Sequence, residues 1–111
     1  MTQTPTIDKE IRGHRIVFRA WTYGEKQDAL RKSTTFKQVD DMLEPDIDPW
    51  TLNDNMLIRC ITEWDLKDEA TGQPLPITVE AIRNIRPPEL VEEMIAFAQT
   101  INGVSVTLKK K

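Results

Sequence analysis

The stretch Ile61–Ile101, ITEWDLKDEATGQPLPITVEAIRNIRPPELVEEMIAFAQTI, decides how this chain folds. It begins with an apolar element that ends at Trp64, and a polar turn containing Gly72 follows. The Pro-Leu-Pro sequence at residues 74–76 restricts any strand there to the edge of a sheet, because proline has no backbone N–H to donate. We therefore expect a small hairpin over residues 65–77.

Two short amphipathic helices complete this stretch. Thr78 is a favourable N-cap for a helix over residues 79–85, and Arg86-Pro87-Pro88 ends it, because a residue before proline avoids helical dihedrals. A second helix is predicted over residues 88–101. Its apolar stripe recurs at helical spacing: Leu90, Met94, Phe97 and Ile101.

Upstream of this stretch, the sequence predicts one strand and two further helices. Residues 14–21 are rich in β-branched and aromatic side chains, which favours a strand. Thr22 and Glu25 have the spacing of a capping box for a helix over residues 23–32. Asp48-Pro49 begins a helix predicted to run to Trp64. Its apolar stripe is Leu57, Cys60, Ile61 and Trp64.

Together these elements predict an α+β fold that is mainly helical, with an N-terminal strand, about four short helices and a small hairpin. A chain of 111 residues fits a single domain, which we place at residues 12–103. Residues 1–11 are polar and predict a flexible arm, and residues 104–111 predict either a C-terminal strand or a basic tail. The predicted core comprises Phe18, Leu30, Leu57, Ile61, Trp64, Ile82, Leu90, Met94 and Phe97.

Composition excludes several classes of partner. The formal net charge is −3, and the chain is more acidic still without Lys109–Lys111, so we expect no nucleic-acid binding. No apolar run approaches the ~20 residues of a membrane span. The single cysteine cannot form an internal disulfide, and the N-terminus has no signal-peptide pattern. These features predict a cytoplasmic protein, in the host cytoplasm if it is viral.

The residue types that carry chemistry are scarce. His14 is the only histidine, and its default interpretation is a surface residue. Cys60 lies on an apolar helical stripe, where a small core residue is expected. One cysteine and one histidine do not supply the four ligands of a structural zinc site. We therefore predict a protein that is not an enzyme, with no catalytic, cofactor-binding or metal-binding residues.

An acidic interval from Asp40 to Asp54 contains six acidic residues and no basic one. The simpler interpretation is a solvated connector. The alternative is a surface for a basic partner with an exposed tryptophan as anchor, because tryptophan is enriched at binding hot spots. A calcium loop is excluded, since Pro49 and Trp50 occupy positions that its pattern does not allow. The candidate partner-binding residues are Trp50, Asp40, Asp41, Glu44 and Asp46.

The stretch that decides the fold also resembles a segment of the tail assembly chaperones of long-tailed bacteriophages. The pattern is W-(D/x)-L-x-D-x-x-G-x-P-L-P-(V/I)-T-x-E-x-(I/L). The matching residues are Trp64, Asp65, Leu66, Asp68, Gly72, Pro74, Leu75, Pro76, Thr78, Glu80 and Ile82. The matching residues lie within positions 64–82 of the 111-residue chain.

The resemblance implies a small non-enzymatic protein that binds the tape-measure protein, and also the tail tube protein, while a phage tail is built. It implies no catalytic residues. The surplus of tryptophan and methionine independently predicts a homo-oligomer or the binding of a largely helical partner. Two alternatives stay open: a permanent tail-completion or connector protein of the virion, and a small regulatory module that binds a host protein.

Overall fold

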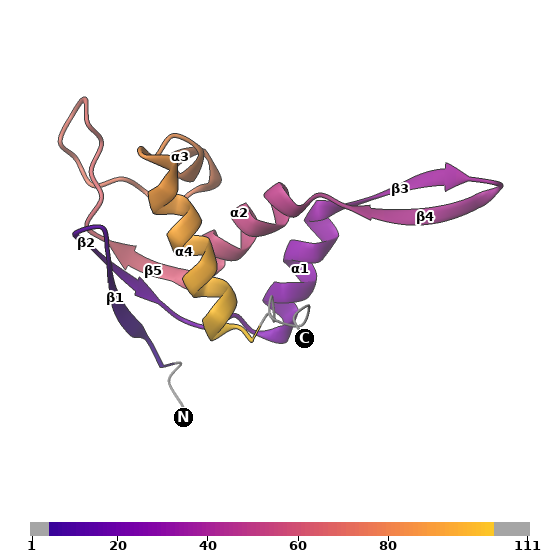
Figure 1. The fold of residues 1–111 in the computed structure, drawn as a ribbon, viewed down its shortest axis with the longest axis horizontal. Coiled ribbons are helices and arrows are strands. Elements are labelled where there is room, and N and C mark those ends of the chain that lie inside the picture. Colours follow the sequence, from indigo (N-terminus) through magenta and orange to yellow (C-terminus); the bar gives the residue numbers. More distant parts are fainter. Residues whose placement is uncertain (1–4, 104–111) are drawn as a thin grey trace.

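The computed structural model describes residues 5–103 and contains four helices and five strands within that range (Figure 1). The elements in chain order are β1 (Ile7–Ile11), β2 (His14–Phe18), α1 (Tyr23–Ser33), β3 (Thr34–Val39), β4 (Met42–Ile47), α2 (Pro49–Cys60), β5 (Ile61–Trp64), α3 (Val79–Arg83) and α4 (Pro88–Ile101).

Three strands form an antiparallel sheet in the order β1-β2-β5. A two-residue turn joins β1 to β2, with Ile11 opposite His14 and positive φ angles at Arg12 and Gly13. Two positive φ angles in such a turn match the right-handed twist of the flanking strands. The strand β5 pairs with β2 and places Ile16 opposite Trp64.

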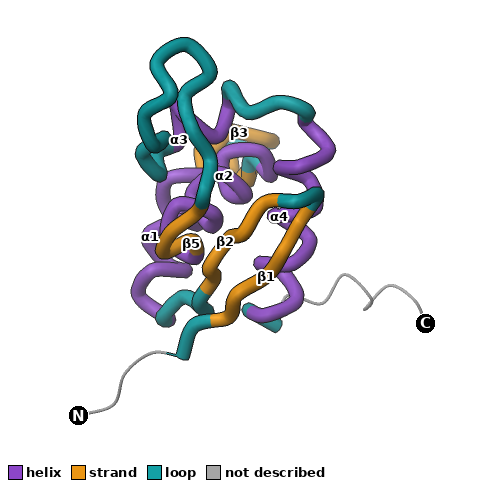
Figure 2. The backbone as a smooth tube through the Cα atoms, turned by 90° about the vertical axis from the view of Figure 1, so that its left-hand side faces the viewer, coloured by secondary structure: helices purple, strands orange, loops and turns teal. Residues whose placement is uncertain are grey.

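The helices α2 and α4 contact each other, and they supply the core against the sheet (Figures 1 and 2). The ring of Phe18 on β2 meets the ring of Phe97 on α4 edge-on, with centroids 4.9 Å apart. Edge-to-face aromatic pairs of this kind add to the gain from burial alone. The largest fully buried side chains are Phe18, Ile16, Leu57, Leu90, Met94 and Cys60.

The strands β3 and β4 form a second, separate sheet of two strands. They continue from α1 and lead into α2, and the hairpin extends away from the rest of the molecule (Figure 1). The radius of gyration is 15.9 Å, against about 13 Å for a typical domain of this size. The protruding hairpin explains the excess.

The base of this hairpin is fixed to the two helices. The backbone N–H of Asp48 donates to the carbonyl of Ser33 at 2.8 Å. This hydrogen bond joins the residue before β3 to the residue after β4. Ser33 is buried, and its hydroxyl donates to the carbonyl of Ala29 at 2.6 Å. Asp48 is also the N-cap of α2, accepting from the N–H of Trp50 at 3.1 Å.

The prediction of a mainly helical fold is wrong, because helices contain 42% of the described residues and strands contain 28%. Residues 61–64 were expected to end a helix but form β5. The helix ends at Cys60, where backbone pairing with β2 replaces the next helical turn. The interval from Asp40 to Asp54 is interpreted from the sequence as a solvated connector, but its first part forms the turn and second strand of the β3–β4 hairpin and its last part belongs to α2.

Other expectations agree with the structure only in part. Residues 7–11 of the expected arm form β1, because their backbone pairs with β2. The expected hairpin over residues 65–77 is limited to an isolated bridge between Lys67 and Pro74. Of the predicted core, Leu30, Trp64 and Phe97 are only partly buried, and the other six are buried. The expectation for residues 104–111 lies outside the described residues.

Candidate protein-binding surface

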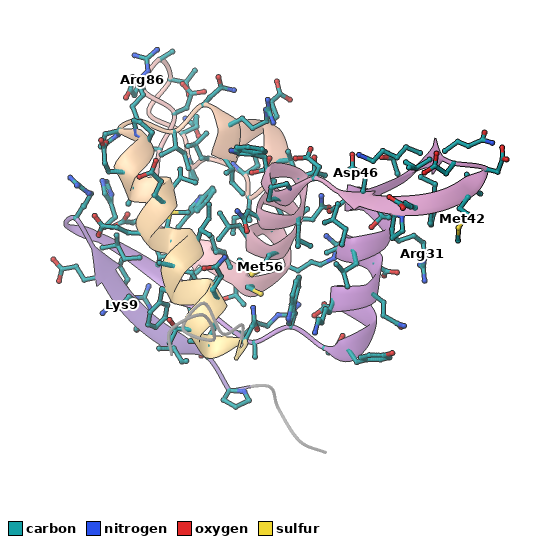
Figure 3. The ribbon with its side chains drawn as sticks, turned by 45° about the vertical axis from the view of Figure 1, so that its right-hand side comes forward. Lys9, Arg31, Met42, Asp46, Met56 and Arg86 are labelled. Carbon is teal, nitrogen blue, oxygen red and sulfur yellow. The ribbon has the colours of Figure 1, made fainter. Side chains whose placement is uncertain are left out.

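The structure places the four acidic candidate residues on the β3–β4 hairpin. Asp40 and Asp41 form its two-residue turn, with φ angles of 52° and 66°. Glu44 and Asp46 lie on β4, and Figure 3 shows Asp46 nearer the base of the hairpin than Met42. All four side chains are exposed. The acidic interval is therefore a structured arm, not a connector, over most of its length.

One face of this arm is apolar. Successive side chains of a strand alternate between faces, and directly opposed residues share a face. The register pairs Phe36 with Pro45 and Gln38 with Leu43, and Thr34 with Ile47. Phe36 is 65% exposed, Leu43 70% and Ile47 47%, so the structure leaves this face uncovered. We call Phe36, Leu43, Pro45 and Ile47 the apolar face of the hairpin.

The opposite face carries most of the strand charges. It pairs Thr35 with Asp46 and Lys37 with Glu44, and only Val39 and Met42 beside the turn are apolar. Lys37 is the single basic residue of the hairpin, against four carboxylates. Within residues 5–103, none of those four carboxylates has an ion-pair partner within 4.0 Å. The arm therefore combines an apolar face with uncompensated negative charge.

Trp50 stands close to the base of the hairpin, in the first turn of α2, and is 74% exposed. It lines a groove between α2, α3 and α4, whose apolar walls include Ile82, Ile85, Val91 and Ile95. Arg83 spans this groove to Asp54, with Nη1 to Oδ2 at 3.5 Å. The structure brings the fifth candidate residue near the hairpin but leaves its side chain uncovered.

The apolar residues Phe36, Leu43 and Ile47 were missed by sequence reasoning. A signal was present after the turn, where Leu43, Pro45 and Ile47 are apolar at alternate positions. Aspartate tolerates positive φ better than most residues, so Asp-Asp forms a two-residue hairpin turn, but less recognisably than Asn-Gly does. Pro45 argued against a strand, yet proline is accepted at a sheet edge.

His14 and Asp65 form a hydrogen-bonded pair, with Nδ1 3.0 Å from Oδ1, beside a pocket lined by the loop after β5 and by α3. Burial raises the pKa of Asp65, but hydrogen bonds from the Arg15 amide and His14 outweigh it, so the pKa is lowered overall. The residues that line this pocket include no serine, threonine or cysteine that His14 could activate by removing a proton.

Cys60 is buried in the core. Burial raises the pKa of the Cys60 thiol, which keeps it protonated, and Asn102 Nδ2 lies 3.2 Å from its sulfur. Across residues 5–103, no group of three or more metal-ligating side chains comes together. In the same range, no helix has both the length and the apolar character needed to cross a membrane.

The chain matches no protein-family model, no curated protein and no solved structure.

Proposed function

We propose that this protein is a non-enzymatic tail assembly chaperone of a long-tailed bacteriophage, and that it binds the tape-measure protein during tail assembly. The observation that carries a binding function is the protruding hairpin with its uncovered apolar face. A contiguous exposed apolar surface in an otherwise polar molecule marks an interaction site. The phage assignment itself comes from the resemblance in residues 64–82.

The residues that carry the resemblance form one folded unit, which supports treating them as a fold-determining pattern. The indole Nε1 of Trp64 donates to the carbonyl of Leu75 at 2.9 Å. The N–H of Leu75 donates to the carbonyl of Leu66 at 3.0 Å, and the N–H of Gly72 to that of Asp68 at 2.7 Å. These hydrogen bonds hold the loop after β5 in one conformation.

The direct test is co-expression of the tagged protein with the tape-measure protein of the same phage, followed by affinity purification. We expect the tape-measure protein to be retained. The double variant Phe36→Ser/Leu43→Ser should lose it, whereas Tyr23→Ser, which changes an equally exposed aromatic residue on α1, should not. No retention by the wild-type protein would contradict the proposed function.

Mature particles provide a second measurement. A chaperone should be absent from purified virions, whereas stoichiometric amounts there would favour a permanent virion component. Retention of an unrelated host protein in place of the tape-measure protein would favour a regulatory module.

A further inference from the structure

We infer that the apolar face of the hairpin receives one amphipathic helix of the partner, with lysine or arginine residues flanking the apolar stripe of that helix. The inference rests on the proposed function, because it specifies the chemistry of the segment that such a partner would present. It concerns a surface formed by Phe36, Leu43, Pro45 and Ile47, with the acidic turn Asp40-Asp41 at its distal end.

The apolar face of the hairpin packs against no other described element. An isolated two-stranded hairpin is at best marginally stable in water and normally packs against a further strand or a helix. In the described residues, the strands β3 and β4 pair only with each other, and every residue from Thr35 to Ile47 is exposed. The hairpin extends away from the helices and the three-stranded sheet (Figure 1), so no other described residue covers this face.

The dimensions of the face match a helix. Leu43 to Ile47 spans four residue steps of a strand, or about 14 Å at ~3.4 Å per residue. Two strands are about 5 Å apart, so the surface is one helix wide. About three turns of an α-helix, at 5.4 Å per turn, cover that length and present an apolar stripe along it.

Strand addition at an edge of the hairpin explains the surface less well. Pro45 has no backbone N–H in the middle of β4, so the β4 edge is less able to pair with an added strand. A strand added beside β3 would satisfy its free backbone groups, but it would leave Phe36 and Leu43 uncovered on the face. A helix laid across the face buries both side chains.

The negative charge of the hairpin favours a cationic helix as its partner. The turn residues Asp40 and Asp41 lie at the end of the apolar face, whereas Glu44 and Asp46 lie on the opposite face with Lys37. The hairpin as a whole carries four carboxylates against one basic residue, so its net charge attracts cations. A second copy of this chain would bring the same acidic arm, and the whole chain is itself negative at −3, so it is a poor occupant. A cationic amphipathic helix instead places its apolar stripe on the face and its basic residues within reach of the turn.

The test uses the full-length protein and synthetic peptides of about 18 residues, which form roughly five helical turns. One peptide has a leucine stripe flanked by lysines, a second has glutamates in place of the lysines, and a third scrambles the first. We expect the lysine peptide to bind at least about tenfold more tightly than either control and to shift the NMR signals of Phe36, Leu43 and Ile47. Equal binding of the lysine and glutamate peptides, or shifts confined to other elements, would overturn the inference.

Two variants separate the apolar from the electrostatic contribution. Phe36→Ser/Leu43→Ser should abolish lysine-peptide binding, with Tyr23→Ser as the matched control. Asp40→Asn/Asp41→Asn keeps side chains that accept positive φ and should lower the association rate and its salt dependence, because peripheral charges act mainly on association. The matched control is Glu10→Gln/Glu69→Gln, which removes two exposed carboxylates elsewhere. Unchanged peptide binding in Phe36→Ser/Leu43→Ser would overturn the inference.

The two proposals fail in different experiments. If the wild-type protein does not retain the tape-measure protein but binds the lysine peptide on the hairpin, the proposed function fails and the chemistry of the surface stands. If it retains the tape-measure protein equally well with Phe36→Ser/Leu43→Ser, the proposed function stands and this surface is wrong.

Discussion

Phe36 and Pro45 lie directly opposite each other in the β3–β4 hairpin, and both side chains are exposed on the same face of a two-stranded sheet. A cross-strand apolar pair normally contributes to stability by packing against a third element. Here the described part of the chain provides none. Under the proposed function, this pair belongs to the surface that a partner covers.

The first prediction separates residues of the fold from residues of the surface. Phe18 is fully buried against Phe97, whereas Phe36 is 65% exposed. We expect Phe18→Ala to lower the free energy of unfolding by about 3–5 kcal/mol and Phe36→Ala by less than about 1 kcal/mol. Urea denaturation measures both. A similar loss in the two variants would show that the hairpin packs into the core.

The second prediction concerns the hairpin turn. Replacing Asp40-Asp41 by Asn-Gly supplies the preferred residues for two positive φ angles. We expect slower amide hydrogen exchange in β3 and β4, with the global free energy of unfolding changed by less than about 0.5 kcal/mol. Replacing both residues by valine should speed the exchange, since β-branched residues resist positive φ. Equal exchange in the two variants would contradict the observed turn.

The third prediction is a pH dependence. Arg19 Nη1 and Nη2 donate to the two carboxylate oxygens of Glu25 at 3.0 and 2.7 Å, and Thr22 N–H donates to the same carboxylate. The hydrogen bond with Arg19 is the largest cause that lowers the pKa of Glu25. A lowered pKa in the folded state stabilises the protein above the unfolded pKa of about 4.3, and that gain disappears as the pH falls through the folded value.

Glu25→Gln should therefore lower the free energy of unfolding by about 1–2 kcal/mol at pH 7, since charge-assisted hydrogen bonds of this kind are worth that much. The difference from wild type should shrink as the pH falls below about 4. Denaturation at several pH values measures it, with the exposed Glu69→Gln as control. A difference that stays constant with pH would show that the ion pair is not its source.

Local signals in the sequence predicted where each helix begins, although α2 and α3 end earlier than predicted. The capping box of Thr22 and Glu25, the Thr78 N-cap and the Pro88 start of α4 are formed by residues within one helical turn of each other. Such interactions can be recognised without knowing the rest of the fold. The apolar stripe of α4 likewise has a period that identifies one buried face.

The strands were harder to predict, because their pairing is non-local. Ile61 and Trp64 fit a helical stripe equally well, and only the backbone of β2, more than forty residues earlier, makes them a strand. The hairpin was missed since its apolar side chains are interrupted by Pro45 and four acidic residues. The sequence makes the same acidic residues and Trp50 candidates for partner binding, but the apolar face beside the acidic turn is evident only in the structure.

The most direct measurement is hydrogen–deuterium exchange of the protein alone and in complex with the tape-measure protein. We expect the largest loss of exchange in β3 and β4, residues 34–47, because a bound helix would shield this otherwise exposed arm. The exposed face of the β1-β2-β5 sheet should exchange as in the free protein. Protection confined to that sheet or to α4, with the hairpin exchanging at its free rate, would contradict a binding role for the hairpin.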